Sequence, residues 1–527
     1  MTEEEETPAS TTTIPNGQEE EQGVAATDVA DTSENVRIGS ISSARFNILS
    51  TMVGGGCLSL PLAFQQSGNA LIGPLMLLVT GVITNFCFQR LVQTSRAINP
   101  PHTVTPGKDT FESITSEAFG PTANVVSMGL VVLMCFFGTV GYSVLLRDMV
   151  EPLNDWILAA TKLAATSSAV TLWFHKNFTM FLVIVLVTPF CTLRRLTALK
   201  DCGALSMVSL LILGGCIVIR SVQCQLGVGG DDNEFFEMLD DEPWYSHLKL
   251  FPDSWHDLLN ALPLYISCFV CHYNILPVHN ELQNPTEERV NKWLSTTTWF
   301  AVGLYMVMGF AGSAYAHCTP TGKVQGNILL DFDEHDPLLM VGRMCLAVTI
   351  TLAFPMLVIP GRDIVVRSVI LPRMQQMQTN TSGAIETSVE EELAEPLLND
   401  EQEEISGDDN NDETSNDKIS FLMLLSISIT LFWSAAALAS LVSSIDVVWD
   451  LLGSSLSILM SYLIPAGTYL VITKQSEEDT TESNDDEPTS YGKKASRVAC
   501  WLLLVGSVPL MIVSTANAVY NTFFLKD

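Results

Sequence analysis

Long apolar stretches alternate with shorter polar ones along almost the whole chain after residue 40. Eleven of these stretches hold about 20 mostly apolar residues, the length that an α-helix needs to cross the hydrocarbon core of a bilayer. The pattern predicts an all-α integral membrane protein with eleven transmembrane helices. The predicted spans lie near residues 45–66, 70–94, 122–147, 176–193, 202–222, 258–280, 296–316, 337–359, 419–443, 447–472 and 498–521.

The polar part of the chain is strongly acidic. The 527 residues include 58 Asp and Glu against 26 Lys and Arg, a formal net charge of −32, although 47% of the residues are hydrophobic. Such a chain lacks the basic face that nucleic-acid binding requires. Most of the acids gather in segments with too little apolar surface to form a core, which predicts disorder. The predicted organisation is an acidic tail at 1–40 and a membrane domain at 41–527, which carries an acidic insert at 374–417 and an acidic loop at 475–492.

The distribution of Lys and Arg predicts the orientation of the chain in the membrane. With eleven spans, eighteen of these residues fall on the side of the N-terminus and seven on the other side, while Arg343 lies inside the eighth span. Because cytosolic loops carry the excess of positive charge, the N-terminus is predicted to be cytosolic and the C-terminus extracellular or lumenal. The acidic segments at 1–40, 374–417 and 475–492 then also face the cytosol.

Two spans contain features that disturb a helix. In the first span three consecutive glycines, Gly54, Gly55 and Gly56, each weaken a helix by about 1 kcal/mol relative to alanine. They are explained either by close packing of small residues or by an unwound segment whose free N–H groups bind an anion. In the sixth span Pro277 removes one hydrogen bond and crowds the carbonyl of Tyr273, which predicts a break at that point.

The two disturbed spans occupy corresponding places in the chain. They are the first members of two sets of five spans, and the eleventh span is extra. Paired interruptions in corresponding positions of two halves indicate a secondary transporter built from inverted repeats, because the broken helices line the binding site. The predicted architecture is therefore a 5+5 inverted repeat plus one helix.

Five motifs occur in a fixed order along the chain. They are Phe46 to Pro61, Leu199-Lys200-Asp201, Cys271 to Pro277 with Glu281-Leu282, Val324 to Leu330, and Pro355 with Pro360-Gly361-Arg362. Together they resemble those of the amino acid/auxin permease family, within the amino acid–polyamine–organocation superfamily. This family includes vacuolar amino-acid transporters and sodium-coupled neutral amino acid transporters. The resemblance covers roughly residues 40–521 without the acidic segments.

The resemblance implies a LeuT-like fold that moves amino acids across a membrane by alternating access. It assigns the backbone N–H groups of Gly54, Gly55 and Gly56 to the substrate carboxylate, since the N-terminal end of a broken helix favours an anion. It assigns a second group, from the sixth span, to the α-amino group and side chain of the substrate: Phe269, Val270 and Cys271.

The coupling ion stays open between Na⁺ and H⁺, and no cofactor is expected. In sodium-coupled members the ion lies between the first and eighth spans, at positions that match Ser50, Val53 and Thr351 here. Some of these relatives have Asn where this chain has Ser50, which keeps proton coupling open. For a proton the first candidate is His272, because an imidazole titrates near neutral pH. Two further carboxylates lie near the predicted cytosolic face: Asp201 and Glu281.

Signals outside the predicted site bear on compartment and stability. Cys224 and Cys318 fall on the same predicted outer side, where a disulfide between them is one alternative. Glu395-Pro396-Leu397-Leu398 resembles an acidic dileucine signal for the vacuole or lysosome, while the plasma membrane stays an alternative. Arg343 is predicted to form an ion pair or a gate near the outer mouth.

The sequence favours a transporter of neutral amino acids, acting by symport or antiport, over other functions. The alternative is an amino-acid sensor that uses the same pocket with little flux and recruits cytosolic partners through its acidic segments. An enzyme or an ATP-driven pump is disfavoured, because the chain has no GxxxxGK[ST] phosphate loop and no evident nucleophile–base pair. The expected partners are the amino-acid substrate and membrane lipid.

Overall fold

The computed structural model describes residues 39–99, 110–161, 176–192, 202–226, 248–334, 336–370, 372–373, 421–481 and 491–524. These residues belong to one compact unit, Arg37–Asp527. The acidic insert at 374–417 and the acidic tail, except for its last two residues, lie outside them. The acidic loop predicted at 475–492 is described up to residue 481 and again from 491, and its first part continues a helix.

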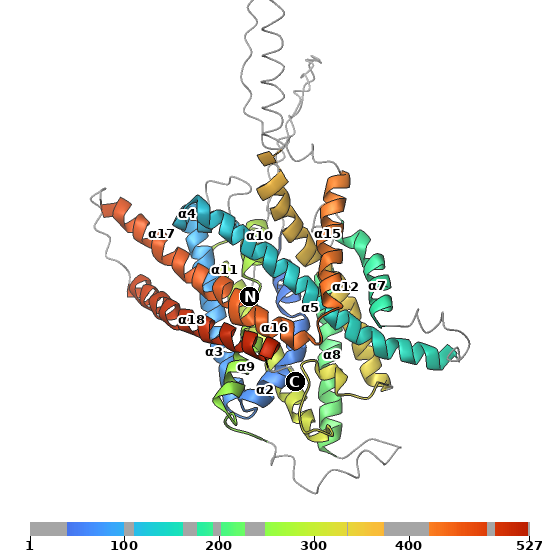
Figure 1. Ribbon diagram of the computed structural model, residues 1–527. Helices are drawn as coiled ribbons and strands as arrows, with labels where there is room; N and C mark the ends of the chain where they lie inside the picture. The colour runs from blue at the N-terminus through green and yellow to red at the C-terminus, as the bar shows by residue number, and fades with distance from the viewer. Residues whose placement is uncertain are drawn as a thin grey trace, which may run out of the picture. The chain divides into compact units, whose positions relative to one another are not determined.

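The described part of the chain is helical, apart from an isolated β-bridge between Gly39 and Leu282. Figure 1 shows the helices packed side by side, with α17 next to α18. The first half contains α1 (Ile41–Met52), η1 (Gly55–Ser59), α2 (Leu60–Ser67), α3 (Ile72–Ile98), α4 (Phe111–Phe119), α5 (Pro121–Thr161), α7 (Lys176–Cys191) and α8 (Cys202–Gln225). The second half contains α9 (Trp255–Ser267), α10 (His272–Glu281), α11 (Glu287–Ala314), η4 (Tyr315–Cys318), η5 (Ile328–Leu330), α12 (Pro337–Val365), η6 (Val366–Ile370), α15 (Phe421–Ala439), α16 (Ile445–Leu452), η7 (Gly453–Ser457), η8 (Leu459–Leu463), α17 (Ile464–Thr481) and α18 (Tyr491–Phe524).

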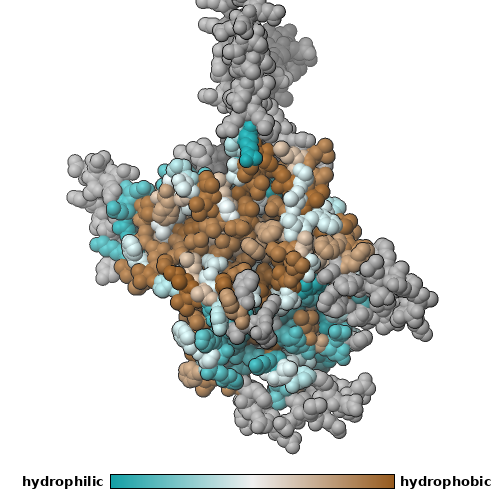
Figure 2. All heavy atoms as spheres, viewed as in Figure 1, coloured by the Kyte–Doolittle hydropathy of each residue, from teal (hydrophilic) through white to brown (hydrophobic). Residues whose placement is uncertain are grey.

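Helix length and composition identify nine membrane-spanning segments among the described residues. A bent pair, Ile41–Met52 with Gly55–Ser67, makes a tenth. At the place of the predicted fourth span lies a shorter apolar helix, Phe178–Cys191. The total of eleven therefore stays a prediction that depends on this short helix. Figure 2 shows a broad hydrophobic surface over the helices, as a bilayer requires.

Local sequence signals explain where several helices begin. Asp336 accepts hydrogen bonds from the backbone N–H groups of Leu338 and Leu339, and Pro337 fits the first helical position of α12. Thr286 caps α11 in the same way, and Ser254 caps α9. These caps satisfy N–H groups that have no partner within their own helix.

Two glycines of α11 allow α2 to pack closely against it. A Cβ atom at Gly309 would lie 2.5 Å from the Phe64 ring, and one at Gly312 would overlap Pro61. Helices in a membrane associate mainly through such close contact, since lipid provides no hydrophobic driving force. The packing fixes α2, which directly follows the glycine-rich segment of the first span.

Buried arginines attach loops at one end of the bundle through backbone carbonyls. Arg343, for which we expected an ion pair or a gate, is 2% exposed and forms no ion pair among the described residues. Its guanidinium instead donates, over 2.9–3.2 Å, to the carbonyls of Leu329, Phe332, Asp333 and Glu334. Arg147 pairs with Asp148 at 3.3 Å and donates, over 2.7–3.1 Å, to the carbonyls of Ala439, Val442 and Ser443. Each arginine thus holds one connection in place.

Candidate substrate site

The first span is broken at the predicted glycines. α1 ends at Met52, and the chain bends by 49° before it continues as η1 and α2. Gly54 adopts φ −119° and ψ −147°, outside the helical region. The structure therefore favours the unwound segment over simple close packing as the role of these glycines.

The sixth span is also broken, but not at Pro277. α9 ends at Ser267 and α10 begins at His272, so the break comprises Cys268–Cys271, while Pro277 lies inside α10. The end of α9 tightens: the N–H groups of Phe269 and Val270 donate three residues back, to Ile266 and Ser267. The helix has thus already ended and restarted before Pro277, and the prediction of a break at the proline was wrong.

The side chain of Tyr305, on α11, joins the two breaks. Its hydroxyl oxygen lies 2.8 Å from the Met52 carbonyl and 2.8 Å from the Cys268 carbonyl. These carbonyls lie at the C-terminal ends of α1 and α9, where a helix leaves its acceptors unsatisfied. Tyr305 is fully buried and packs edge-on against Phe269, with ring centroids 5.2 Å apart. It therefore fixes the position of one break relative to the other.

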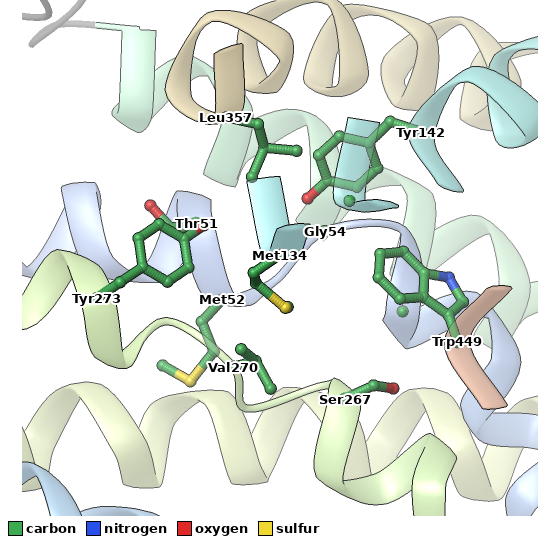
Figure 3. A pocket seen from close by; sticks show the side chains of 12 residues that line it. Thr51, Met52, Gly54, Met134, Tyr142, Ser267, Val270, Tyr273, Leu357 and Trp449 are labelled. Carbon is green, nitrogen blue, oxygen red and sulfur yellow. The ribbon is translucent and has the colours of Figure 1, made fainter. Parts of the chain in front are cut away.

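A small cavity lies between the breaks (Figure 3). Its volume of about 30 Å³ accommodates roughly two water molecules. An amino acid does not fit without movement of the walls. The lining residues come from the first, third, sixth, eighth and tenth spans: Thr51, Met52, Gly54, Gly56, Met134, Gly138, Tyr142, Ser267, Val270, Tyr273, Leu357 and Trp449.

The phenol of Tyr142 occupies the place where the substrate carboxylate is expected. A Cβ atom at Gly54 would overlap its hydroxyl oxygen, and one at Gly55 would lie 3.4 Å from the ring. The ring packs edge-on against Phe354 and Trp449, with centroids 6.2 Å apart in each pair. The phenol oxygen of Tyr142 thus already lies against the glycine segment.

The structure brings together part of the predicted substrate site. Gly54, Gly56 and Val270 line the cavity, and Gly55 lies against the ring of Tyr142 beside it. The other two predicted residues, Phe269 and Cys271, are buried in the packing around the break.

The predicted sodium residues lie on facing elements with protein contacts of their own. Ser50 donates to the Asn47 carbonyl at 2.9 Å and meets α12 at the sulfur of Met356, 3.6 Å away. Thr351 donates to the Ala347 carbonyl within α12 at 2.8 Å. Val53 is fully buried just before the glycines. A thioether is a poor ligand for a hard cation such as Na⁺, so a sodium site here needs a rearrangement of these groups.

His272 is the first residue of α10 and is fully buried. Its ring packs on Phe88 with centroids 4.5 Å apart, and neither ring nitrogen has a hydrogen-bond partner among the described residues. The positive end of a helix dipole and an apolar neighbour both disfavour an imidazolium ion. Of the other predicted proton carriers, Asp201 lies outside the described residues and Glu281 is exposed at the end of α10.

Three aromatic residues of the site had no sequence signal that we recognised: Tyr142, Tyr305 and Trp449. Each occurs within an apolar span, where an aromatic side chain is typical of ordinary packing. The contact of Tyr142 with Gly54 joins residues far apart in the chain, and hydrophobic periodicity does not report such pairs.

The family model described as "Transmembrane amino acid transporter protein" matches residues 37–513. The chain belongs to this family. The chain is 23% identical over 334 residues to vacuolar amino acid transporter 7 of Saccharomyces cerevisiae, a match that covers 62% of this chain and 59% of that protein. It is 22% identical over 329 residues to the putative sodium-coupled neutral amino acid transporter 11 of Bos taurus, covering 62% of each. The match thus spans about three fifths of each relative.

A solved structure of MhsT in complex with L-phenylalanine has the same fold as this chain. The two share 10% sequence identity and a TM-score of 0.50, and the match covers 90% of this chain and 98% of MhsT. The LeuT-like fold implied by the motifs is thus supported.

Proposed function

We propose that this family member is a secondary active transporter of neutral amino acids, which works by alternating access and couples transport to Na⁺ or H⁺. The observation that carries the proposal is the pair of breaks, in the first and sixth spans, that meet at one cavity and are joined by Tyr305. In this arrangement, the backbone of two broken helices lies beside one cavity, where it can bind both ends of an amino acid.

The contact between Tyr142 and the glycine segment suggests how substrate enters the site. A substrate carboxylate forms strong hydrogen bonds with backbone N–H groups, whereas the phenol of Tyr142 only packs against the Gly54–Gly56 segment, so the carboxylate displaces it. Displacement moves the phenol away from the cavity and enlarges it. Substrate binding and opening of the cavity are thus one event, as alternating access requires.

Flux through purified protein tests the proposal. The protein is reconstituted in liposomes, and uptake of labelled neutral amino acids is measured with a Na⁺ gradient, with a pH gradient and with neither. We expect substrate-dependent accumulation under at least one gradient. Absence of flux for every substrate and gradient would falsify the proposal.

The membrane in which the transporter acts is proposed from its relatives and motifs. A vacuolar relative and the dileucine-like Glu395–Leu398 favour the vacuole or lysosome, with the plasma membrane as the alternative. The sensor alternative has no support from the relatives, which are named as transporters. Deletion of 2–36 separates the two functions, because a transporter retains flux and a sensor loses its signal.

A further inference from the structure

α16 carries two acidic residues inside an apolar span. Asp446 and Asp450 are one helical turn apart, within the segment Ile445–Gln475 that is long and apolar enough to cross the membrane. Ionisable residues at such positions are costly and usually functional. Asp450 directly follows Trp449, which lines the central cavity.

Asp446, Asp450 and Gly453 lie on one face of the helix formed by α16 and η7, and this face packs on neighbouring elements. Asp446 packs against Gly326, where a Cβ atom on the glycine would overlap the Asp446 carboxylate. Gly453 packs against α9, where a Cβ atom on this glycine would overlap the carbonyl of Pro263. Residues three and four apart share a helix face, so Asp450 lies between these two contacts. It therefore faces the junction of α16, α9 and the loop that contains Gly326.

The two carboxylates differ in their partners. Asp446 accepts a hydrogen bond from the Ser444 hydroxyl. The Oδ1 atom of Asp450 is buried and has no hydrogen-bond partner among the described residues, where Asp450 also forms no ion pair. Removing an ionised carboxylate oxygen from water without a donor or a cation is strongly unfavourable. Although Asp450 is partly exposed as a residue, its buried Oδ1 therefore favours the neutral, protonated carboxyl.

The charged and titratable groups of the packed elements leave Asp450 without a counter-ion. On α5, Arg147 is committed to Asp148 and to three carbonyls of the turn that precedes α16. The cations on the other packed elements form no ion pair with Asp450 among the described residues: Lys323 is exposed in the Gly326 loop, and Lys493, Lys494 and Arg497 lie in the first turns of α18. The remaining groups are phenols, acids, or a histidine in the exposed first turn of α9: Tyr142 on α5, His256, Asp257 and Tyr265 on α9, Tyr520 on α18, and Asp446 on α16 itself.

We propose that Asp450 is the proton-binding residue of this transporter, so that its carboxylate takes up H⁺ from one side of the membrane and releases it to the other in step with the substrate. This inference rests on the proposed transport function and specifies its coupling ion. When α16 separates from the Gly326 loop, water reaches the carboxylate and allows exchange of the proton. When the two are packed together, Oδ1 is buried, which favours retention of the proton.

The aromatic contacts connect this residue to the substrate. Trp449 packs on Tyr142, and Tyr142 covers the glycine segment. A substrate that displaces Tyr142 must also shift the indole next to Asp450. The same movement that accepts the amino acid therefore changes the surroundings of the proton site.

The test compares Asp450→Asn with wild type in liposomes, in two assays. Uptake driven by a pH gradient requires proton binding, whereas exchange of labelled for unlabelled substrate without a gradient requires only the substrate site. We expect D450N to lose gradient-driven accumulation and the pH dependence of exchange, but to keep exchange at one chosen pH within about twofold of wild type. Retained exchange also shows that the variant is folded.

Each other outcome is informative. If D450N still accumulates substrate under a pH gradient, or keeps the wild-type pH profile, the inference is overturned. It is also overturned if wild-type uptake responds to Na⁺ and not to pH, a result that leaves the proposed transport function standing. If D450N loses exchange as well, Asp450→Glu decides: a titratable carboxyl should retain coupling with a shifted pH profile, and an unshifted profile contradicts the proposal. No flux in wild type refutes the transport function itself.

Discussion

At the scale of single residues, the contact between Gly54 and Tyr142 is the most constrained feature of the site. The phenol oxygen occupies the space in which any other residue at position 54 would place its Cβ atom. The neighbouring Gly56 has more room, since a Cβ atom there would lie 3.5 Å from the sulfur of Cys268, an ordinary contact distance. Two glycines of one motif thus differ in what they tolerate.

Gly54→Ala should therefore abolish uptake, because the added methyl group displaces Tyr142 and distorts the segment that binds the carboxylate. Gly56→Ala is the matched control and should retain most of the wild-type activity. Uptake in liposomes, normalised to the amount of protein inserted, checks the pair. Equal loss in both variants would mean that the motif serves helix packing in general.

Tyr305→Phe should lower both stability and transport, because it removes the hydroxyl shared by the two breaks. We expect a loss of about 1 kcal/mol, typical of one buried hydrogen bond, seen as a lower melting temperature in detergent. Tyr520→Phe is the control, since Tyr520 is 56% exposed on α18 and should leave both quantities unchanged. A Tyr305→Phe protein with wild-type melting and flux would contradict the proposed link between the breaks.

The sequence predicted the backbone part of the site better than the side-chain part. Three adjacent glycines identify their own place in the chain, because their conformational freedom is a local property. Tyr142, Tyr305 and Trp449 acquire their roles only from residues on other helices. The lack of a hydrogen-bond donor at Asp450 also depends on neighbouring elements, and it becomes visible only once α16 is packed on α9.

At the scale of helices, the two broken spans show which local rules hold inside a membrane. The glycine break was predicted at the correct place. The proline prediction failed, because a proline within α10 is tolerated where neighbouring helices support the chain. The break instead follows the tightened last turn of α9, which no residue type announces.

The disulfide between Cys224 and Cys318 ties the end of α8 to η4, after α11. It closes a loop of 94 residues, and its Cα atoms are 6.3 Å apart. Cys224→Ser should destabilise the protein by about 2–4 kcal/mol, because the unfolded chain gains freedom.

Melting curves with and without reductant check this prediction, with Cys345→Ser as the control for loss of a free cysteine. Reductant should lower the melting temperature of the control but leave that of Cys224→Ser unchanged. A reductant effect of the same size in both variants would rule out this pairing as its source.

At the scale of the whole molecule, the positive-charge asymmetry and the number of spans must agree. Nine long segments and one bent pair are found, so the short helix α7 decides whether the total is odd or even. An odd total places the two termini on opposite sides of the membrane. The division of Lys and Arg into eighteen on one side and seven on the other assumes eleven spans, an odd total.

Epitope tags on each end test the topology. After selective permeabilisation of the plasma membrane, the N-terminal tag should be accessible to antibody and the C-terminal tag protected, if the protein lies in an internal membrane. Tags accessible together would mean that α7 does not span and that the predicted count is ten. A tag in the 374–417 insert, predicted to be cytosolic, serves as an internal control.

Arg343 bears on how substitutions at this end of the bundle should be interpreted. It binds four carbonyls of the segment Leu329–Glu334, and carbonyl groups are present whatever the side chains are. Related sequences can therefore diverge within this segment without losing the attachment, whereas Arg343 itself has no equivalent replacement, since lysine lacks the planar fork of donors. Variation in the loop is then expected to be mild in effect, and a change of the single arginine to be severe.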